Sequence, residues 1–496
     1  MRNMYFRYQQ SPSLSKRARR LRSLAVVASV GLLTGLTISS ANAIPAFWNG
    51  PANGNWSAPS NWSSTPFFPS NGNGAPTYEV NTNGLSGDVV ITLDTSVSLA
   101  SMRVSSGDSL RVNSGSRVLE VGAGSFGGLI LDNTGNSTIA VDGAGSQLNL
   151  TFAASGFTNA INSGIIEAIN GGSLVLRGNS PSGFITIDQL GGPDRTLRAI
   201  DAGSTLELAG TGLNIRGGFL NIGAGAALRV NASTNGFSHG LDNVQVTNAG
   251  TIEVVAGASL DHFVFGPLNN TGLIHLNGTA GNQAVLNAIN LDLQGSGRLL
   301  LDEGRIQRAP FSSLLNIQNS TGHTIEGQGS IEAASLFNSS LIQATGGDVL
   351  NVAVGVNSFG GPILDNSGTL RADGAGSQLN LTSQQPFFSG KRNTGTIEAI
   401  NGGMVMLDNS MAGLSSIENT GVIRATNGGH LIIRNTAVLN FFGSVQVDGT
   451  STIEYRDGGF VEPAGGGPVI TGGGTLINSS SFISGTGSYG QILWTA

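Results

Sequence analysis

Apolar residues recur along this chain at alternate positions, in short runs separated by small polar residues. Ile166 and Ala168 flank Glu167, and Leu174 and Leu176 follow two glycines further on. Because successive side chains of a strand point to opposite faces, each such run predicts a short, half-buried strand. Beyond residue 43 no apolar run has helical spacing, so the pattern predicts an all-β protein.

One motif, Asn-x-Gly-x-(Ile/Leu)-x-(Ala/Val/Leu), repeats through the chain. Its copies, including two weaker ones at Asn338 and Asn366, begin at Asn162, Asn248, Asn270, Asn338, Asn366, Asn393 and Asn419. Asn and Gly tolerate positive φ, so Asn-x-Gly is expected to form a tight corner. A second turn, often Gly-Gly, and a second strand follow, which predicts two strands per coil.

Strands this short are unstable alone, and stacking supplies the missing partner. The repeats therefore predict a β-solenoid, specifically a single-stranded right-handed parallel β-helix. The 27- and 26-residue spacings of Asn366, Asn393 and Asn419 predict one coil each, with about 4.8 Å between coils. This register predicts an inner stack of Leu370, Ile397 and Ile423. It also predicts an outer stack of alternating charge, formed by Arg371, Glu398 and Arg424.

A larger repeat is also present. Asp142–Thr151 and Asp373–Thr382 both read DGAGSQLNLT, and Ile166–Gly172 and Ile397–Gly403 both read IEAINGG. Each pair is offset by 231 residues. This predicts a duplicated block of several coils, which a solenoid tolerates because each coil contacts only its neighbours.

Four segments are expected. Residues 1–43 predict a signal peptide, with a basic start, an apolar stretch and the small-x-small site Ala41-Asn42-Ala43, so that Ile44 becomes the N-terminus. A membrane anchor is the alternative, disfavoured by the short, interrupted apolar run. The others are a capping segment at 44–95, solenoid repeats at 96–440, and terminal coils with a C-terminal cap at 441–496.

The capping segment contains Trp48, Trp56 and Trp62. A solenoid needs its first coil covered, and aromatic side chains bury large areas. We therefore expect these rings to close the N-terminal end, with a sugar-stacking platform as the alternative.

Charge and composition exclude several functions. Charged residues make up 11% of the chain, and removing 1–43 lowers the net charge from −6 to −13 and leaves one lysine, Lys391. An acidic surface repels phosphate backbones, so nucleic-acid binding is not expected. Cysteine is absent, which excludes disulfides, thiolate metal sites and a lipoprotein anchor.

Clustered charges are the candidates for chemistry, because paired carboxylates can act as acid and base in glycoside cleavage. The two densest groups are Asp292, Arg298, Asp302, Glu303, Arg305 and Arg308, and Asp194, Arg195, Arg198 and Asp201. Adjacent Asp302 and Glu303 would point to opposite faces of a strand, so a solvated turn is expected instead.

The histidines, His239, His262, His275, His323 and His430, lack short metal-ligand spacing. His275 and His430 are expected to be exposed. No catalytic, cofactor-binding or metal residue is predicted, and no cofactor.

These repeats resemble those of autotransporter passenger domains and related exported β-helix proteins, and the Trp48…Trp56…Trp62 opening is similar to theirs. The chain lacks the long amphipathic C-terminal strands of a translocating barrel and the tail of sorting-signal relatives. A fragment of a larger autotransporter is a further alternative.

The expected function is an exported structural or adhesin-like protein, not an enzyme, with a repetitive polar surface for weak multivalent binding of a cell-surface glycan or protein. The alternative is a secreted polysaccharide lyase or glycoside hydrolase on the same fold. The expected location is extracellular or at the cell surface, with the periplasm as an alternative, and no transmembrane segment in the mature chain.

Overall fold

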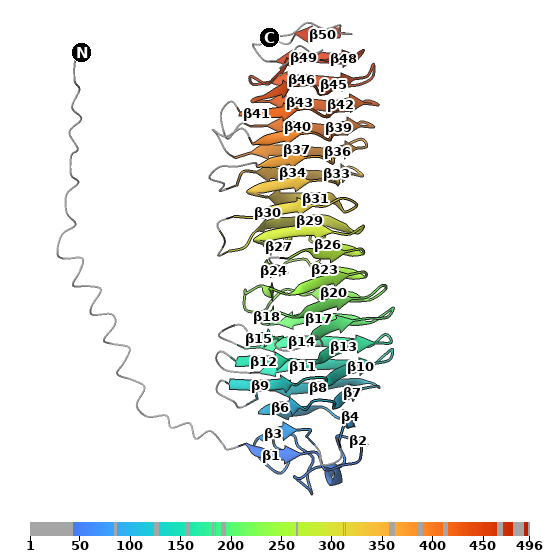
Figure 1. The fold of residues 1–496 in the computed structure, drawn as a ribbon, viewed down its shortest axis with the longest axis vertical. Coiled ribbons are helices and arrows are strands. Elements are labelled where there is room, and N and C mark those ends of the chain that lie inside the picture. Colours follow the sequence, from blue (N-terminus) through green and yellow to red (C-terminus); the bar gives the residue numbers. More distant parts are fainter. Residues whose placement is uncertain are drawn as a thin grey trace, which may run out of the picture. The chain divides into compact units, whose positions relative to one another are not determined.

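The computed structural model describes residues 43–83, 87–123, 128–153, 158–180, 183, 185–189, 195–263, 266–310, 312, 314–356, 363–384, 390–409, 415–463, 470–479 and 491–494. Parallel strands stack coil upon coil in this part of the chain and form a β-solenoid of about 14 turns (Figure 1). The only helix among these residues is the short 3-10 turn η1 (Pro59–Asn61). The prediction of an all-β parallel solenoid is thus confirmed.

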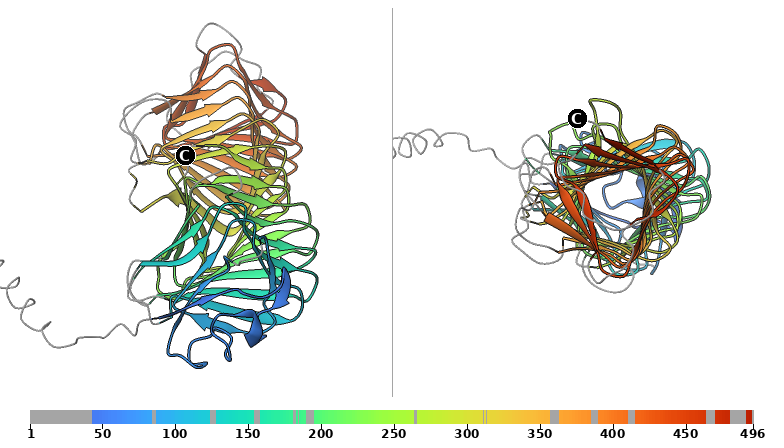
Figure 2. Two further views of the ribbon diagram at one scale, coloured as in Figure 1. Left: turned by 60° about the horizontal axis from the view of Figure 1, so that its bottom comes forward. Right: turned by 90° about the horizontal axis from the view of Figure 1, so that it is seen from above.

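Three sheet faces surround the core, and a view down the long axis shows them as the sides of a triangle (Figure 2). Face 1 contains β5 (Val97–Leu99), β8 (Ser116–Val121), β11 (Gln147–Ala153), β14 (Ser173–Asn179), β17 (Thr205–Gly210), β20 (Ala227–Val230), β23 (Thr251–Val255), β26 (Leu273–Asn277), β33 (Leu341–Thr345), β36 (Thr369–Asp373), β39 (Thr396–Ile400), β42 (Val422–Thr426), β45 (Ser444–Val447) and β48 (Thr471–Gly472). Face 2 contains β1 (Ile44–Phe47), β3 (Tyr78–Asn81), β6 (Ser101–Val104), β9 (Gly128–Asn133), β12 (Thr158–Asn162), β15 (Ile185–Asp188), β18 (Leu213–Arg216), β21 (His239–Asp242), β24 (Ser259–Phe263), β27 (Ala284–Ala288), β34 (Val349–Val354), β37 (Gln378–Ser383), β40 (Met404–Asp408), β43 (His430–Arg434), β46 (Thr452–Arg456), β49 (Thr475–Ser479) and β50 (Gln491–Trp494). Face 3 contains β2 (Asn53–Asn55), β4 (Val90–Thr92), β7 (Ser109–Val112), β10 (Thr138–Asp142), β13 (Ile165–Ile169), β16 (Thr196–Ala199), β19 (Phe219–Ile222), β22 (Gln245–Asn248), β25 (Leu268–Asn270), β28 (Asn290–Gln294), β30 (Asn316–Asn319), β32 (Ser335–Asn338), β35 (Leu364–Asn366), β38 (Lys391–Asn393), β41 (Ser415–Asn419), β44 (Thr436–Asn440) and β47 (Phe460–Pro463). Two long strands, β29 (Arg298–Arg308) and β31 (Thr324–Glu332), continue from face 1 into face 2.

The expectation of two strands per coil is therefore wrong, because most coils have three. The missing strand ends at the motif asparagine and is short: β38 has only three residues, KRN. Its inward side chains are Lys391 and Asn393, which are 3% and 0% exposed. Polar inward residues give no apolar alternation, so the pattern could not show this strand.

The corner at Asn-x-Gly also forms for a different reason than expected. The repeats place their positive φ values at the second turn, for example at Asn170 (52°) and Asn401 (55°), whereas the motif asparagines are buried. The motif glycine is required by a close approach between coils. A Cβ on Gly395 would lie 2.1 Å from the carbonyl oxygen of Gly368 in the preceding coil, far inside van der Waals contact.

Six of the seven motif asparagines, together with Asn319 and Asn440, form a hydrogen-bonded column inside the corner between faces 3 and 1; the seventh, Asn162, lies on face 2. This asparagine ladder consists of Asn248, Asn270, Asn319, Asn338, Asn366, Asn393, Asn419 and Asn440. Asn366 Nδ2 donates to Asn393 Oδ1 at 2.7 Å and to the Thr396 carbonyl at 3.1 Å. Each amide thus joins its coil to the next and satisfies buried polar groups there.

The predicted register around Ile397 is confirmed. Leu370 pairs with Ile397, and Ile397 pairs with Ile423. On the outer side, Glu398 accepts from Arg371 at 2.6 Å and from Arg424 at 2.7 Å. Glu398 is only 1% exposed because the two arginines cover it.

The duplicated sequence occupies two different faces. Ile166 lies on β13 of face 3, which pairs with β10 and β16, whereas Ile397 lies on β39 of face 1. The local geometry is the same, since Asn170 and Gly171 have φ of 52° and 80°, and Asn401 and Gly402 have 55° and 82°. The repeat therefore encodes a strand and its turn, independently of the face.

Trp48, Trp56 and Trp62 pack together at the N-terminal end of the stack. They are at most 1% exposed, and the ring of Trp62 lies 5.0 Å from that of Trp48 and 4.6 Å from that of Trp56. Each indole N–H donates to a backbone carbonyl, of Pro51, Pro69 and Trp56 respectively. Rings this deeply buried cannot stack on a sugar, which removes the sugar-platform alternative for them.

The predicted signal peptide lies outside the described residues, apart from Ala43. Among the described residues no helix is both long enough and apolar enough to cross a membrane.

Candidate functional site

The first charged group from the sequence does not form a single site. Asp292 lies on face 3, where it accepts from Gln294 at 2.9 Å. Arg298 lies on face 1 and pairs with Glu326 at 2.9 Å, while Arg305 lies on face 2 and pairs with Glu332 at 2.6 Å. The solenoid therefore separates these side chains onto three different faces.

Asp302 and Glu303 lie where β29 bends from face 1 into face 2. The pairing shifts between Asp302 and Gly304, and Glu303 has a φ of 49°, so this is a bulged turn. Glu303 Oε1 accepts from Gln328 Nε2 at 2.5 Å, and Asp302 is exposed. The two carboxylates lie at a solvated turn, as the sequence indicated.

The second charged group is also divided. Arg198 forms an ion pair with Glu167 at 2.6 Å on face 3. Asp201 accepts from the backbone N–H of Asn170 at 3.2 Å, and Asp194 lies outside the described residues. Within the described ranges, no group of three His, Cys, Asp or Glu side chains could hold a metal ion.

The histidines behave in two ways. His275 and His430 are half-buried rather than fully exposed, and His430 Nε2 lies 3.0 Å from Glu454 Oε2. His239, His262 and His323 are 0–1% exposed, and desolvation by burial lowers the pKa of each imidazole to about 4. The alternation pattern alone could not distinguish these buried imidazoles from surface ones.

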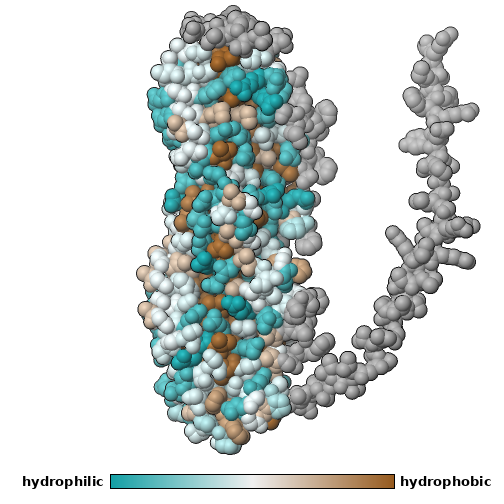
Figure 3. All heavy atoms as spheres, turned by 180° about the vertical axis from the view of Figure 1, so that it is seen from behind, coloured by the Kyte–Doolittle hydropathy of each residue, from teal (hydrophilic) through white to brown (hydrophobic). Residues whose placement is uncertain are grey.

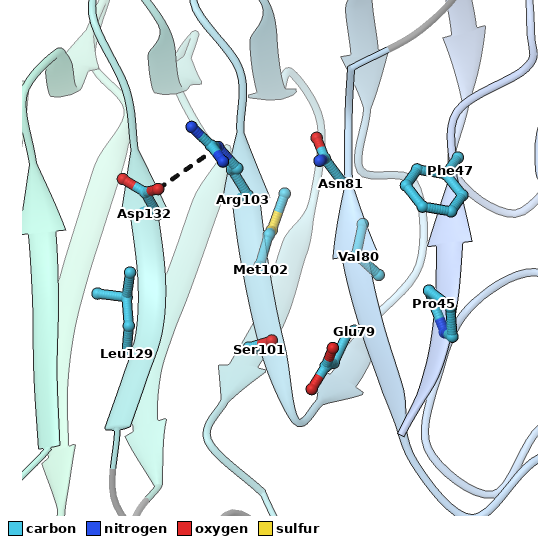
Figure 4. A pocket seen from close by; sticks show the side chains of 10 residues that line it. All are labelled: Pro45, Phe47, Glu79, Val80, Asn81, Ser101, Met102, Arg103, Leu129 and Asp132. Atoms are coloured by element: carbon cyan, nitrogen blue, oxygen red, sulfur yellow. Dashed lines mark ion pairs between the residues drawn. The ribbon is translucent and has the colours of Figure 1, made fainter. Parts of the chain in front are cut away.

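A hollow of about 320 Å³ lies on face 2 near the N-terminus, across β1, β3, β6 and β9 (Figure 4). We call its outward side chains the N-terminal platform, comprising Pro45, Phe47, Glu79, Asn81, Ser101, Arg103, Leu129 and Asp132. The sequence pattern did not predict this platform, because Phe47 falls within the segment expected to form a cap, in which the tryptophans are the conspicuous aromatic residues.

The strand register places one platform residue from each coil in a row. Phe47 lies beside Asn81, Asn81 beside Arg103, and Arg103 beside Asp132. The Phe47 side chain is 43% exposed, unusually high for a large apolar side chain on a sheet. Leu129 is 44% exposed and forms a second apolar surface at the opposite end of the hollow from Phe47.

Charges on the platform largely compensate each other. Arg103 Nε lies 3.4 Å from Asp132 Oδ2. Partial burial raises the pKa of the Asp132 carboxyl, and the nearby Arg103 opposes that shift. Glu79 is exposed, and Asn81 Oδ1 accepts from the Asn83 backbone N–H and from Ser105 Oγ at 2.9 Å each. The row combines an apolar ring with donors and acceptors of nearly balanced charge.

A second hollow, of about 390 Å³ on face 3, has a similar composition. Asp292, Gln318 and Phe337 lie in register on β28, β30 and β32. We call this set the Phe337 row. A carboxylate, an amide and a phenyl ring thus occur in line at two places on the solenoid. On the face drawn in Figure 3, small hydrophobic patches lie in a line along the length of the stack, between hydrophilic residues.

No protein-family model, curated protein or solved structure matches this chain.

Proposed function

We propose that this chain is an exported, non-enzymatic, adhesin-like β-helix protein that binds neutral glycan chains weakly at more than one place. The observation that carries the proposal is the occurrence of in-line rows in which an amide lies beside a phenyl ring and a carboxylate lies further along, at the N-terminal platform and at the Phe337 row.

The chemistry of these rows suits a sugar. The C–H face of a pyranose is apolar and packs against an aromatic ring, while its hydroxyls need donors and acceptors around that ring. Asn81 lies beside Phe47 and Arg103 follows it in the row, while Gln318 lies beside Phe337. A row of side chains along stacked strands follows an extended chain better than a closed pocket does.

The charge balance favours a neutral glycan over an acidic one. The residues after 43 carry a net charge of −13, which repels polyuronates at low salt. On the platform, Arg103 is paired with Asp132 and Glu79 adds an exposed carboxylate, so the row has no net positive charge to attract a carboxylate ligand. A non-catalytic role is further supported by the dispersal of the candidate carboxylates over separate faces and turns.

Binding by the purified protein, residues 44–496, to immobilised neutral and acidic polysaccharides tests the proposal. Phe47→Ala and Phe337→Ala should each weaken binding to neutral polysaccharides by about 5- to 30-fold, the effect of removing an aromatic anchor worth ~1–2 kcal/mol. The double variant should lose more than either, because both rows contribute to retention on the immobilised polysaccharide.

Phe442→Ala is the matched control. Phe442 is 86% exposed but belongs to neither row, so its loss should leave binding unchanged. Equal losses in the control and in the row variants, or tighter binding to acidic than to neutral polysaccharides, would contradict the proposal.

A further inference from the structure

The asparagine ladder has one coil without an asparagine. After Asn270 the register places Asn269 beside Gln294, so the next position belongs to Gly295, which has no side chain. A Cβ there would lie 2.3 Å from the carbonyl oxygen of Asn270. The ladder resumes at Asn319 in the following coil, where the register pairs Asn319 with Leu293, an apolar residue that cannot continue the ladder either.

The imidazole of His323 fills this gap. Its Nε2 lies 3.0 Å from Asn270 Nδ2, and its Nδ1 lies 3.0 Å from Asn319 Oδ1. The imidazole can reach both asparagines because the corner that carries it is longer than the next one. Four residues separate Asn319 from β31, whereas two separate Asn338 from β33. His323 is 0% exposed.

The ladder fixes the protonation state of this imidazole. Asn270 Oδ1 accepts from Asn248, and Asn270 Nδ2 also donates to the Arg298 carbonyl, so this amide nitrogen can only donate to Nε2. Asn319 Nδ2 donates to Asn338 Oδ1, so Asn319 Oδ1 accepts from Nδ1. The ladder therefore requires the neutral tautomer with hydrogen on Nδ1.

A proton on Nε2 would face the amide hydrogens of Asn270, and no carboxylate inside the corner could offset the charge. The surrounding elements are β26, β28 and the first three residues of β29 and of β31. Their charged or titratable side chains are His275, Asp292, Arg298 and Glu326. All four belong to the outer faces, where Arg298 pairs with Glu326 and Asp292 accepts from Gln294 and Ser320. Desolvation by burial accordingly lowers the pKa of His323 to about 4.

We propose that the His323 corner is an acid-sensitive joint of the solenoid, at which protonation breaks the ladder between Asn270 and Asn319 and opens the coil of residues 290–325 locally. The solenoid on either side remains folded, because each coil is held mainly by its own neighbours. The joint divides the protein into an N-terminal part carrying the platform and a C-terminal part carrying the uninterrupted ladder.

The sign of the effect follows from linkage. A folded pKa of about 4, below the unfolded value of ~6.5, means that the closed state binds fewer protons than the open state between these two values. Closure is therefore fully favoured above about pH 6.5 and is weakened as the pH falls toward 4. At pH 4.5 the opening equilibrium should increase by roughly 50- to 100-fold relative to pH 7.5.

Hydrogen exchange of residues 44–496, read peptide by peptide at pH 7.5 and 4.5, tests the joint. Protection factors, corrected for intrinsic exchange, should fall about 50- to 100-fold in residues 290–325 and much less in residues 364–426, where the ladder holds asparagine only. His323→Gln should abolish the fall, because a glutamine side chain carries both a donating NH2 group and an accepting carbonyl oxygen and does not titrate. His262→Gln, which removes another buried imidazole, should leave the fall in 290–325 unchanged.

Two results would overturn the proposal: an equal loss of protection in 290–325 and 364–426 of the unmodified protein, or the same fall in His323→Gln as in the unmodified protein. The first comparison needs no variant, so it decides the question even where His323→Gln does not fold.

Discussion

Asn393→Ala should open the solenoid locally at the centre of the asparagine ladder. Asn393 Oδ1 accepts from Asn366 at 2.7 Å, and Asn393 Nδ2 donates to Asn419 Oδ1 at 2.7 Å. Truncation leaves a buried N–H of Asn366 and the buried Oδ1 of Asn419 without partners. Each orphaned group costs about 1–3 kcal/mol, so the variant should lose about 2–6 kcal/mol of local stability.

Asn351→Ala is the matched control, because Asn351 is an exposed asparagine on the outside of β34. It accepts from Asn380 at 2.8 Å, but water can replace that bond, so the loss should stay below about 1 kcal/mol. Hydrogen exchange at pH 7.5 reads both effects locally, in residues 364–426 for Asn393→Ala and in residues 349–383 for the control. Similar losses for both variants would refute the view that the ladder holds neighbouring coils together.

Two further substitutions test the packing between coils. Gly395→Ala should lower the free energy of unfolding by about 1–3 kcal/mol or more, because its Cβ would lie 2.1 Å from the Gly368 carbonyl oxygen. Gly449→Ala is the control and should be nearly neutral, because a Cβ there meets open space. Equal shifts of the urea midpoint in the two variants would contradict this reasoning. Ile397→Asp places an unpaired charge between Leu370 and Ile423, so the yield of soluble, protease-resistant protein should fall sharply. A stable variant would show that these three side chains do not form part of a buried core.

Strand pairing and the inside–outside assignment could be predicted from the sequence because they depend on local alternation. Ile397 and Glu398 occupy the faces expected for them, and the 26- and 27-residue spacings are single coils. The third strand could not be predicted, since inward Lys391 and Asn393 look like surface residues in the sequence. Their burial depends on partners in neighbouring coils, namely Asn409 for Lys391 and Asn366 and Asn419 for Asn393.

The N-terminal platform could not be predicted from the sequence either. Phe47, Asn81, Arg103 and Asp132 are separated by 34, 22 and 29 residues, and only the register of four coils brings them into one row. The coil lengths in this region are irregular, so no fixed period connects these positions. The role of His323 could not be predicted for a similar reason, since it depends on Gly295 and Leu293 of the intervening coil, neither of which can continue the asparagine ladder.

Binding measured together with turnover tests the central claim most directly. Residues 44–496 are incubated with neutral and acidic polysaccharides, and bound protein and newly released chain ends are quantified in the same samples. We predict retention on neutral polysaccharide that decreases in Phe47→Ala, with no new chain ends in any sample. Release of new ends that disappears in Asp302→Ala or Glu303→Ala would contradict the account and identify the protein as a polysaccharide-cleaving enzyme.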